Sequence, residues 1–457
     1  MNYVGTARPI HDAKGKATGY TKYAGDLSLP NMAYLCMLHS KIPHGYVKAV
    51  HAEKALALPG VYGVYHCLNT SDRKYNRYRS SFNQAYLANE ERAFNQYVRF
   101  VGDKIGVVAA CDQETAERAA RLVEVEYEEL PFSIGFDDTL AGKNCLEGET
   151  PVRDEYTLEV GKKQESTEGL IEVCSTMELP RLHHATMETH ACIADYDPYS
   201  DMLTVYCPNQ AVHGIRTVLA DFLEMPESHV RVVKATMGGS FGAKQEWFLE
   251  PVTALVAKKL CRPVKLVYSR GEAMTDTIVR GAMRMSARGY YTPDGEMKEI
   301  YCDVTLDAGA YIGNAGDYVR ALAGKPTRCY RIPYMHYHGQ VISSNSPVSG
   351  AFRSWSAAEE ALMMERQLNA AAEKLGMDRL AIRLKNVARS GEEDKKLHLS
   401  LEDIRIGDAI TLGSEKFGWD KLKAEDAAFN ASQQRYRRGV GIGIGGHGNK
   451  NFPPLTK

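Results

Sequence analysis

The sequence lacks paired cysteines, long apolar runs and an excess of either charge. Its ten cysteines are scattered from Cys36 to Cys329, and none forms a C-x-x-C pair, so we expect buried thiols in a reducing compartment and no iron–sulfur cluster held by this chain. No apolar run approaches the ~20 residues of a membrane span, and the start lacks a basic stretch followed by an apolar one. These absences favour a cytoplasmic protein. A net charge of −1 gives no electrostatic support for binding nucleic acid or a membrane.

The size and composition are those of an ordinary globular protein. The chain has 457 residues, 44% of them hydrophobic and 25% charged, which allows two to four domains at about 100–200 residues each. The histidines give one group, His183, His184 and His190, and one pair, His336 and His338. Neither has the spacing to cysteine or glutamate that zinc sites show. We interpret these histidines as core or surface residues.

A glycine-rich segment stands out at residues 237–244, which read Met-Gly-Gly-Ser-Phe-Gly-Ala-Lys. It follows an apolar run, Val230 to Ala235, and precedes a helix-like run, Trp247 to Leu260. Glycines at a strand-to-helix turn let the backbone approach an anion, and a helix start offers free N–H groups. The pattern predicts a site for a large phosphorylated cofactor, with a plain glycine-rich turn as the alternative.

Two better-known phosphate-binding motifs do not fit this chain. A Walker A loop ends in Gly-Lys-Ser/Thr, whereas residues 243–245 are Ala-Lys-Gln. The pattern G-x-G-x-x-G occurs at Gly441, Gly443 and Gly446, but no room follows for the helix and acidic residue of a dinucleotide site. Residues 439–446 are better interpreted as a glycine-rich strand.

Strand and helix signals alternate along the whole chain. Apolar periodicity and turn residues predict the hairpin of Met283–Tyr291 with Met297–Leu306, which encloses a Pro-Asp-Gly turn, and the helices Ala357–Leu375 and Arg379–Asn386. The stretch 147–169 is charged and weakly periodic, so we expect a linker there between domains at 1–146 and 170–457. Mixed runs of strands and helices predict an α+β fold with mixed sheets and packed helices.

Several stretches together resemble the molybdenum-binding (molybdopterin) large subunit of the xanthine dehydrogenase/aldehyde oxidase family, most closely its bacterial purine-type branch. The resemblance covers almost the whole chain. In the first part it rests on residues 19–26 (GYTKYAGD), 43–45 (PHG), 58–61 (LPGV), 101–103 (VGD) and 125–131 (VEYEELP). In the second part it rests on residues 187–188 (ME), Gln210, the glycine-rich segment, 244–246 (KQE), 250–251 (EP), 307–311 (DAGAY), 351–353 (AFR) and 375–378 (LGMD).

The resemblance implies a fold, an activity and partners. The first domain is expected to be of the a/b hammerhead type, and the second to be the first molybdopterin-binding domain. The cofactor is a molybdenum pyranopterin, either molybdopterin or its cytosine dinucleotide. The implied activity is that of an oxidoreductase, the oxidative hydroxylation of a purine or related N-heterocycle with oxygen from water. Electrons are expected to leave through [2Fe-2S] and FAD subunits, because this chain has no place for those centres.

Site residues can be assigned one at a time by the resemblance. Gln210, Gly239, Phe241, Gly242 and Arg353 correspond to cofactor-binding positions. Of these, Gln210, Phe241 and Arg353 surround the molybdenum without being direct side-chain ligands. From the residue alone, Gln210 has an alternative interpretation as part of a helix start, and Arg353 as a surface charge.

Substrate contacts are assigned to Gln245, Arg320 and Trp355. Gln245 stands where animal-type enzymes have a glutamate, and it can both donate and accept hydrogen bonds. Arg320 corresponds to an arginine that stabilises negative charge on the substrate, with a solvated helix arginine as the alternative. Trp355 replaces a phenylalanine and keeps an aromatic face. Because Ser354 and Trp355 leave no cysteine after Arg353, the carbon monoxide branch of the family is disfavoured.

The largest departure from the family lies at the end of the chain. Family subunits continue far beyond this point, and their general-base glutamate is expected beyond Lys457, so no catalytic residue is assigned here. The molybdenum subunit could be split over two polypeptides, with a second molybdopterin-binding chain as partner. Alternatively the chain is a truncated product, which a break inside the strand 439–446 favours. An aldehyde or nicotinate-type substrate, or a non-catalytic interaction remnant, are the alternative functions.

Overall fold

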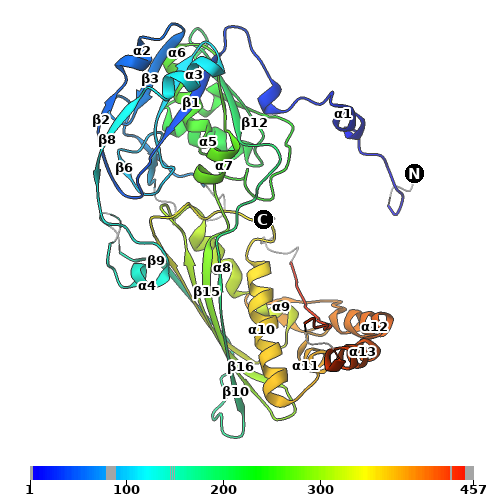
Figure 1. Cartoon of the computed structure of the whole chain (residues 1–457). Coiled ribbons are helices and arrows are strands. Elements are labelled where there is room, and N and C mark those ends of the chain that lie inside the picture. Colours follow the sequence, from blue (N-terminus) through cyan, green and yellow to red (C-terminus); the bar gives the residue numbers. More distant parts are fainter. Residues whose placement is uncertain are drawn as a thin grey trace.

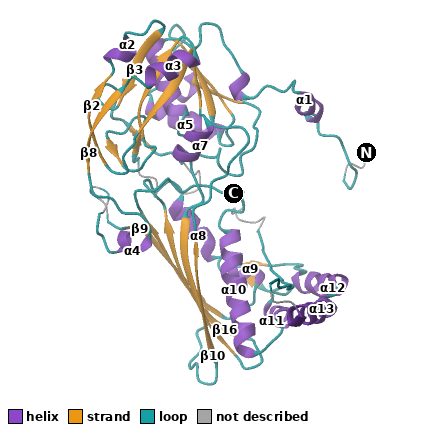
Figure 2. Cartoon of the chain, viewed as in Figure 1, coloured by secondary structure: helices purple, strands orange, loops and turns teal. Residues whose placement is uncertain are grey.

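The protein has two lobes and a projecting N-terminal arm (Figure 1). The computed structural model describes residues 4–78, 89–144, 146, 148, 150–432 and 435–447. The arm carries α1 (Ala13–Thr18), which has no buried residue, and it joins the upper lobe through η1 (Ala24–Asp26). Figure 2 shows strands in both lobes, with helices packed against them.

The upper lobe is built on a seven-stranded mixed sheet in the order β13-β12-β11-β14-β1-β7-β3. The parallel pairing of β1 with β14 aligns Leu35 with Leu266. It therefore joins strands that come from either side of the predicted linker. The strands are β1 (Ala33–His39), β3 (Val61–His66), β7 (Lys104–Ala110), β11 (Ala191–Asp197), β12 (Met202–Cys207), β13 (Val230–Lys234) and β14 (Val264–Val267).

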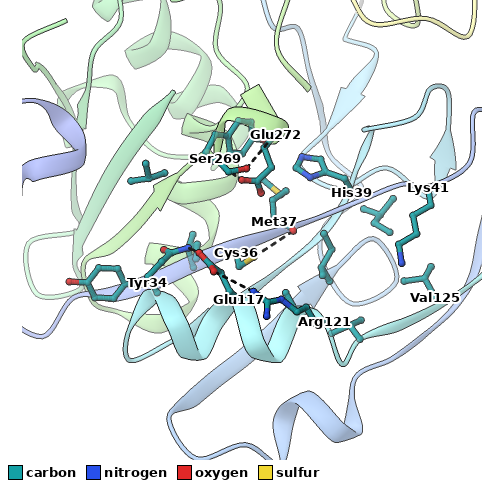
Figure 3. Close-up of a pocket in the computed structure, with 18 of the residues that line it drawn as sticks. Tyr34, Cys36, Met37, His39, Lys41, Glu117, Arg121, Val125, Ser269 and Glu272 are labelled. Carbon is teal, nitrogen blue, oxygen red and sulfur yellow. Dashed lines mark hydrogen bonds and ion pairs between the residues drawn. The ribbon is translucent and has the colours of Figure 1, made fainter. Parts of the chain in front are cut away.

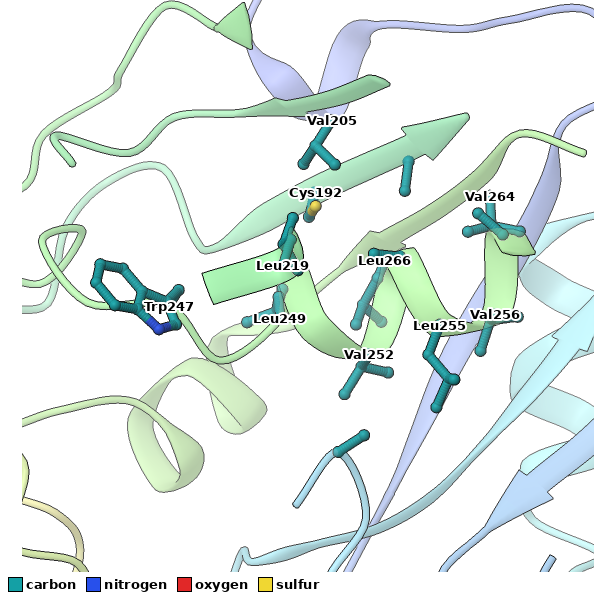
Figure 4. Packing of buried hydrophobic residues seen from close by; sticks show 14 of the residues in the cluster. Cys192, Val205, Leu219, Trp247, Leu249, Val252, Leu255, Val256, Val264 and Leu266 are labelled. Carbon is teal, nitrogen blue, oxygen red and sulfur yellow. The ribbon is translucent and has the colours of Figure 1, made fainter. Parts of the chain in front are cut away.

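One face of this sheet is covered by α5 (Val212–Phe222) and α6 (Glu250–Leu260). The first eight residues of α6 are all buried, which is possible because they are apolar or small except for Glu250. Val252 and Leu255 of α6 lie in the same apolar cluster as Leu266 of β14 (Figure 4). This packing fixes the start of α6, and with it the end of the glycine-rich segment.

The opposite side of β7 and β3 carries α2 (Glu53–Leu56) and α3 (Gln113–Ala120). A three-stranded sheet of β6 (Tyr97–Val98), β2 (Gly45–His51) and β8 (Glu124–Glu129) lies beside them. The remaining short elements of the upper lobe are β4 (Lys74–Tyr75), β5 (Glu91–Arg92), η3 (Glu227–His229) and α7 (Arg270–Asp276), whereas α4 (Phe136–Leu140) lies against the sheet of the lower lobe.

The lower lobe is built on a five-stranded sheet in the order β10-β15-β16-β17-β9. Its strands are β9 (Val152–Gly161), β10 (Ile171–Leu179), β15 (Ala282–Tyr291), β16 (Met297–Asp307) and β17 (Tyr334–Ile342). The helix α10 (Ala357–Leu375) packs on β10 and β15, and α8 (Ala315–Ala323) packs on β17. The other elements are α9 (Pro326–Cys329), α11 (Arg379–Asn386), β18 (Glu393–Asp394), β19 (Leu399–Ser400), α12 (Ile406–Phe417) and α13 (Trp419–Ser432).

The predicted α+β class with mixed sheets is confirmed. Both large sheets contain parallel and antiparallel pairs. The β15–β16 hairpin and the helices α10 and α11 lie where the sequence predicts them.

The segment 147–169, expected to be a linker, contains the strand β9 instead. β9 pairs with β17 over its whole length, and its residues alternate between half-buried and exposed. Glu155 and Glu159 occupy the exposed face of this edge strand, whereas Arg153 and Asp154 are half-buried, so the charges obscured the period of two that a strand requires. The domain limits at 146 and 170 themselves stay a prediction.

Two other expectations are corrected. The helix expected from Trp247 begins only at Glu250, because the buried side chains of residues 247–249 pack in a turn before it. Residues 439–447 belong to neither large sheet. In place of strand pairing, Ile442 and Ile444 contact the apolar core of the lower lobe. No helix in the described part of the chain has both the length and the apolar character needed to cross a membrane.

Candidate functional site

Two loops meet where the lobes join. The glycine-rich loop, residues 237–246, runs between β13 and α6 of the upper lobe, and residues 351–356 lead into α10 of the lower lobe. The amide of Arg353 donates to the carbonyl oxygen of Phe241 at 2.7 Å. Gly242, at φ 104°, allows this approach, because a Cβ there would lie 2.4 Å from the carbonyl oxygen of Ala351. The contact therefore requires glycine at position 242.

Gln210 joins the same cluster from the end of β12. Its side-chain oxygen Oε1 accepts a hydrogen bond from Ser240 Oγ at 2.7 Å, and its backbone N–H donates to the backbone carbonyl of Lys244 at 2.8 Å. The three residues predicted to surround the metal, Gln210, Phe241 and Arg353, are thus linked through the glycine-rich loop. Their individual roles stay a prediction.

Three consecutive amides of the loop face no protein acceptor. The N–H groups of Gly239, Ser240 and Phe241 donate to nothing in the described part of the chain. Gly239 and Phe241 have φ values of 99° and 52°, and Phe241 is 50% exposed. Successive amides in such a bend form a concave donor site for an electronegative group. This geometry fits the predicted cofactor-binding role of the loop.

The second loop stores backbone strain. Ser354, Trp355 and Ser356 follow one another at φ 79°, 29° and 66°, a conformation that non-glycine residues adopt at a cost and mostly at functional sites. Lys325 Nζ donates to the carbonyl of Trp355, and Arg280 Nη2 donates to the carbonyl of Arg353 at 2.9 Å. These two cations hold the strained turn in place.

The predicted substrate residues do not all lie together. Gln245 is exposed on the glycine-rich loop, and Trp355 lies on the second loop with its ring edge-on to Tyr318, 5.9 Å between centroids. Arg320 of α8 instead forms a two-pronged ion pair with Asp154 of β9, in which Nη2 donates to Oδ1 at 2.8 Å. Arg320 therefore faces strand β9, and its substrate role stays a prediction.

Sequence reasoning missed the ion pair beneath the glycine-rich loop. Lys244 Nζ donates to Glu188 Oε2 at 2.6 Å, and the same oxygen accepts from the amide of Gly238 at 2.7 Å. The lysine side chain is 1% exposed, and burial lowers its pKa. Glu188 entered the sequence argument only as part of the family resemblance, so no local signal marked this pair.

Two histidines each form a hydrogen bond to the backbone of one of the two loops. His184 Nε2 donates to the carbonyl of Ala351 at 2.8 Å, and His190 Nε2 donates to the carbonyl of Ala243 at 3.1 Å. Burial lowers the pKa of His184 to about 4 and that of His190 to about 3, so both rings are neutral near pH 7. Their interpretation as core residues agrees with their burial, but their contacts with the loops were not foreseen.

A separate cavity of about 1030 Å³ lies on the upper lobe, away from both loops. Its floor is the face of β1 and β14 that carries Tyr34 and Cys36, with α3 on one side and Glu272 of α7 on the other (Figure 3). None of the residues predicted for cofactor or substrate lines it. The site is therefore defined by the meeting of the two loops and not by this cavity.

Comparisons with known proteins agree with the geometry. Residues 149–387 match the family model of the molybdopterin cofactor-binding domain, and residues 18–131 match the a/b hammerhead domain of aldehyde oxidase and xanthine dehydrogenase. The xanthine dehydrogenase molybdenum-binding subunit of Escherichia coli O157:H7 is 29% identical over 97% of this chain and 59% of its own length. The nicotinate dehydrogenase large molybdopterin subunit of Eubacterium barkeri is 30% identical over 83% of this chain and 88% of its own length.

A solved structure shares the fold. The aldehyde oxidoreductase of Desulfovibrio gigas superimposes with a TM-score of 0.85 at 24% identity, over 93% of this chain and 47% of that one. This chain thus spans about half to three fifths of the length of several relatives. The predicted family and its two domain types are confirmed. The chain belongs to the aldehyde oxidase and xanthine dehydrogenase family and carries its molybdopterin cofactor-binding domain.

Proposed function

We propose that this chain is part of the molybdenum-binding subunit of a hydroxylase that adds water-derived oxygen to a purine or related N-heterocycle, such as xanthine or hypoxanthine. The observation that carries the proposal is the junction of the two loops. There Gln210, Phe241 and Arg353 are linked beside three amides that have no acceptor among the described residues. A preorganised set of donors is what an enzyme needs where negative charge develops.

The residues of this chain would hold the cofactor by backbone and amide contacts. The amides of residues 239–241 would donate to its electronegative groups, and the side-chain amide of Gln210, whose Oε1 accepts from Ser240, would offer a further donor. When bound, the molybdenum cofactor supplies the two-electron oxidation of the substrate carbon. Protein residues then orient the substrate, exclude water and hold protons, as in other cofactor enzymes.

The proposed substrate class rests on Trp355 of the second loop and on Gln245 of the glycine-rich loop. Its indole offers an aromatic face for a planar ring, and Gln245 on the other loop can donate to and accept from a ring nitrogen or carbonyl. The similarity to a xanthine dehydrogenase subunit favours a purine. The similarity to a nicotinate dehydrogenase subunit supports a nicotinate-type heterocycle as the second candidate, and an aldehyde is a third. Arg320 would contact substrate only after leaving Asp154.

The proposal requires partners. We expect a [2Fe-2S] subunit and an FAD-binding subunit to carry electrons away, and we expect the general-base glutamate to come either from a second molybdopterin-binding chain or from a continuation of this one beyond Lys457. The relatives are themselves named as subunits. The proposed location is the cytoplasm, and neither nucleic acid nor membrane is a proposed partner.

The test is to purify the chain from its native host and to measure its co-purifying polypeptides together with molybdenum, iron and flavin. A complex that holds all three and oxidises members of a purine panel is the expected result. Nicotinate or aldehyde oxidation without purine oxidation would replace the substrate class. We expect residues 1–457 alone to give no turnover, so xanthine hydroxylation by the isolated chain would contradict the need for a second half.

A chain that carries no molybdenum, alone or with its partners, would instead identify a non-catalytic interaction remnant. The variant Gly242→Val tests whether metal loading depends on the junction of the two loops. Because a Cβ at this position meets the backbone of Ala351, the variant should separate the two loops. It should lose molybdenum if the loop junction binds the cofactor.

A further inference from the structure

Glu246 lies where the segments of the candidate site converge. Its backbone oxygen accepts from Asn209 Nδ2 at 2.8 Å, and Asn209 directly precedes Gln210. Its side-chain oxygen Oε1 accepts from the amide of Ala351 at 3.4 Å, two residues before Arg353. One residue therefore connects the glycine-rich loop both to the Gln210 segment and to the second loop.

The same side chain is out of contact with solvent. Glu246 is 1% exposed, and its second oxygen, Oε2, is buried without a hydrogen-bond partner in the described part of the chain. An ionised carboxylate with an unpaired buried oxygen costs far more free energy than a neutral carboxylic acid in the same place. Arg77 reduces this cost only in part, because no hydrogen bond joins it to Glu246 among the described residues: its Nε donates to Glu91 at 2.7 Å, and its Nη1 and Nη2 have no hydrogen-bond partner there. The geometry thus favours a neutral carboxylic acid.

The electrostatic surroundings agree. Burial raises the pKa of Glu246 to about 8, although the charge of Arg77 lowers it in part. The charged groups around it are Arg77 and Glu91 from the segment that precedes β5 and from β5 itself, and Lys244 and Glu250 on its own stretch of chain. Burial also raises the pKa of Glu250, to about 7.

The side-chain amide of Asn209 lies between the backbone carbonyl of Glu246 and the carboxyl group of Glu250. Its Nδ2 also approaches Glu250 Oε1 at 3.4 Å, and its Oδ1 accepts from the amide of Ala211 at 2.8 Å. The turn that presents Gln210 is therefore attached to the stretch from Glu246 to Glu250 through the side-chain amide of Asn209. Loss of the Glu246 side chain would remove its contact with Ala351 in the second loop. The hydrogen bond from the Asn209 side chain to the backbone of residue 246 would stay in place.

We propose that Glu246 is a positioning residue that joins the glycine-rich loop to the loop of Arg353 and so keeps the cofactor-binding amides and Gln210 in one arrangement. The inference rests on the proposed function for its purpose. The contact between Glu246 and Ala351 does not depend on that function. The buried side chain of Glu246 acts through Ala351, and its backbone carbonyl accepts from Asn209.

The test is hydrogen–deuterium exchange on the purified native protein, followed in peptides that cover residues 236–246 and 349–356. Glu246→Gln keeps the shape and neutrality of the side chain and should retain wild-type protection at pH 7. Glu246→Ala should raise exchange in the 349–356 peptide by about tenfold or more, through local opening. Glu299→Gln, equally buried but on β16 in the other lobe, should leave both peptides unchanged.

A pH series adds a readout that mere packing would not move. Relative to Glu246→Gln, the wild-type 349–356 peptide should lose protection as pH rises above 8, because ionisation of the buried acid breaks the arrangement. The proposal is overturned if Glu246→Ala leaves the 349–356 peptide protected, or if Glu246→Gln opens it as much as alanine does. Molybdenum content of the wild-type protein is measured in parallel. Its absence would reject the proposed function, while the exchange data still decide the role of Glu246.

Discussion

At the scale of single residues, Ser240 shows how one hydroxyl organises the glycine-rich loop. It donates to Gln210 Oε1 at 2.7 Å and accepts from the amides of Gly242 and Lys244 at 3.3 and 3.2 Å. The sequence places Ser240 in the glycine-rich segment but gives it no role of its own. In the structure the hydroxyl instead connects Gln210 with the loop.

Replacing Ser240 by alanine should therefore loosen the loop without unfolding the protein. We expect a loss of about 1–2 kcal/mol in unfolding free energy, the usual cost of leaving buried partners unpaired, together with lower molybdenum content. Urea denaturation and metal analysis measure the two effects. Ser200→Ala, whose hydroxyl bonds the exposed Asp197, should change neither, and equal effects of the two substitutions would contradict the role of Ser240.

The buried pair of Lys244 and Glu188 leads to a larger expected effect. Lys244→Met would leave the carboxylate, whose side chain is 14% exposed, without its main partner. Breaking such a pair from one side costs about 3–5 kcal/mol. Chemical denaturation should show this loss, whereas Lys54→Met, in the exposed pair with Glu124, should leave the midpoint unchanged. A Lys244→Met protein as stable as the wild type would show that Glu188 finds another partner.

At the scale of elements, helix α11 depends on a side chain before its first turn. Asp378 Oδ1 accepts from the amides of Leu380 and Ala381 at 2.8 and 3.2 Å, and Oδ2 contacts Lys423 of α13. One aspartate therefore caps α11 and attaches α13 to it. The family resemblance included this residue, but only the structure gives it these two contacts.

Asp378→Ala should destabilise the helical end of the lower lobe by about 1 kcal/mol, the typical value of a lost N-cap. Asp378→Asn should retain most of the cap while weakening the contact with Lys423. Limited proteolysis between α11 and α13, together with thermal unfolding, would measure both. If alanine and asparagine behave alike, the cap contributes nothing and the contact with Lys423 accounts for the effect.

At the scale of the whole molecule, buried acids make stability depend on pH. Burial raises the pKa of Glu246, Glu250 and Glu360 from 4.5 to about 8, 7 and 8. The folded chain thus keeps protons that the unfolded chain has released, and stability falls as pH rises towards 8. His184 and His190 act in the opposite direction, but only below their ordinary value of 6.5.

The pH range in which the acids act without these two histidines is therefore 6.5 to 8, and the variant Glu360→Gln tests their effect there. Its two carboxylate oxygens are buried with no hydrogen-bond partner among the described residues. The variant should show a decline of unfolding free energy that is shallower by up to about 1.4 kcal/mol per pH unit, the value of one proton. Urea unfolding at several pH values measures the slope. An unchanged slope would mean that Glu360 is already ionised in the folded protein.

Local sequence determined the elements that depend on neighbours along the chain. The Pro-Asp-Gly turn and flanking alternation predict the β15–β16 hairpin, and the apolar period predicts α11, because turn geometry and helical periodicity act within a few residues. The ordered set of family motifs likewise predicts the domain types. The glycines at 238, 239 and 242 predict a loop where backbone must come close to something, and Gly242 does approach Ala351.

Tertiary structure decided what depends on residues far apart in the chain. Strand β9 exists because β17 offers it a hydrogen-bonding edge, which no local pattern in a charged segment reveals. Arg320 is paired with Asp154, 166 residues away, and burial at the junction of the two loops raises the pKa of Glu246. Pairing and burial of this kind are set by the packing of the two lobes. The sequence by itself therefore determined the family and the identity of the loops, and only the fold decided which of their residues meet.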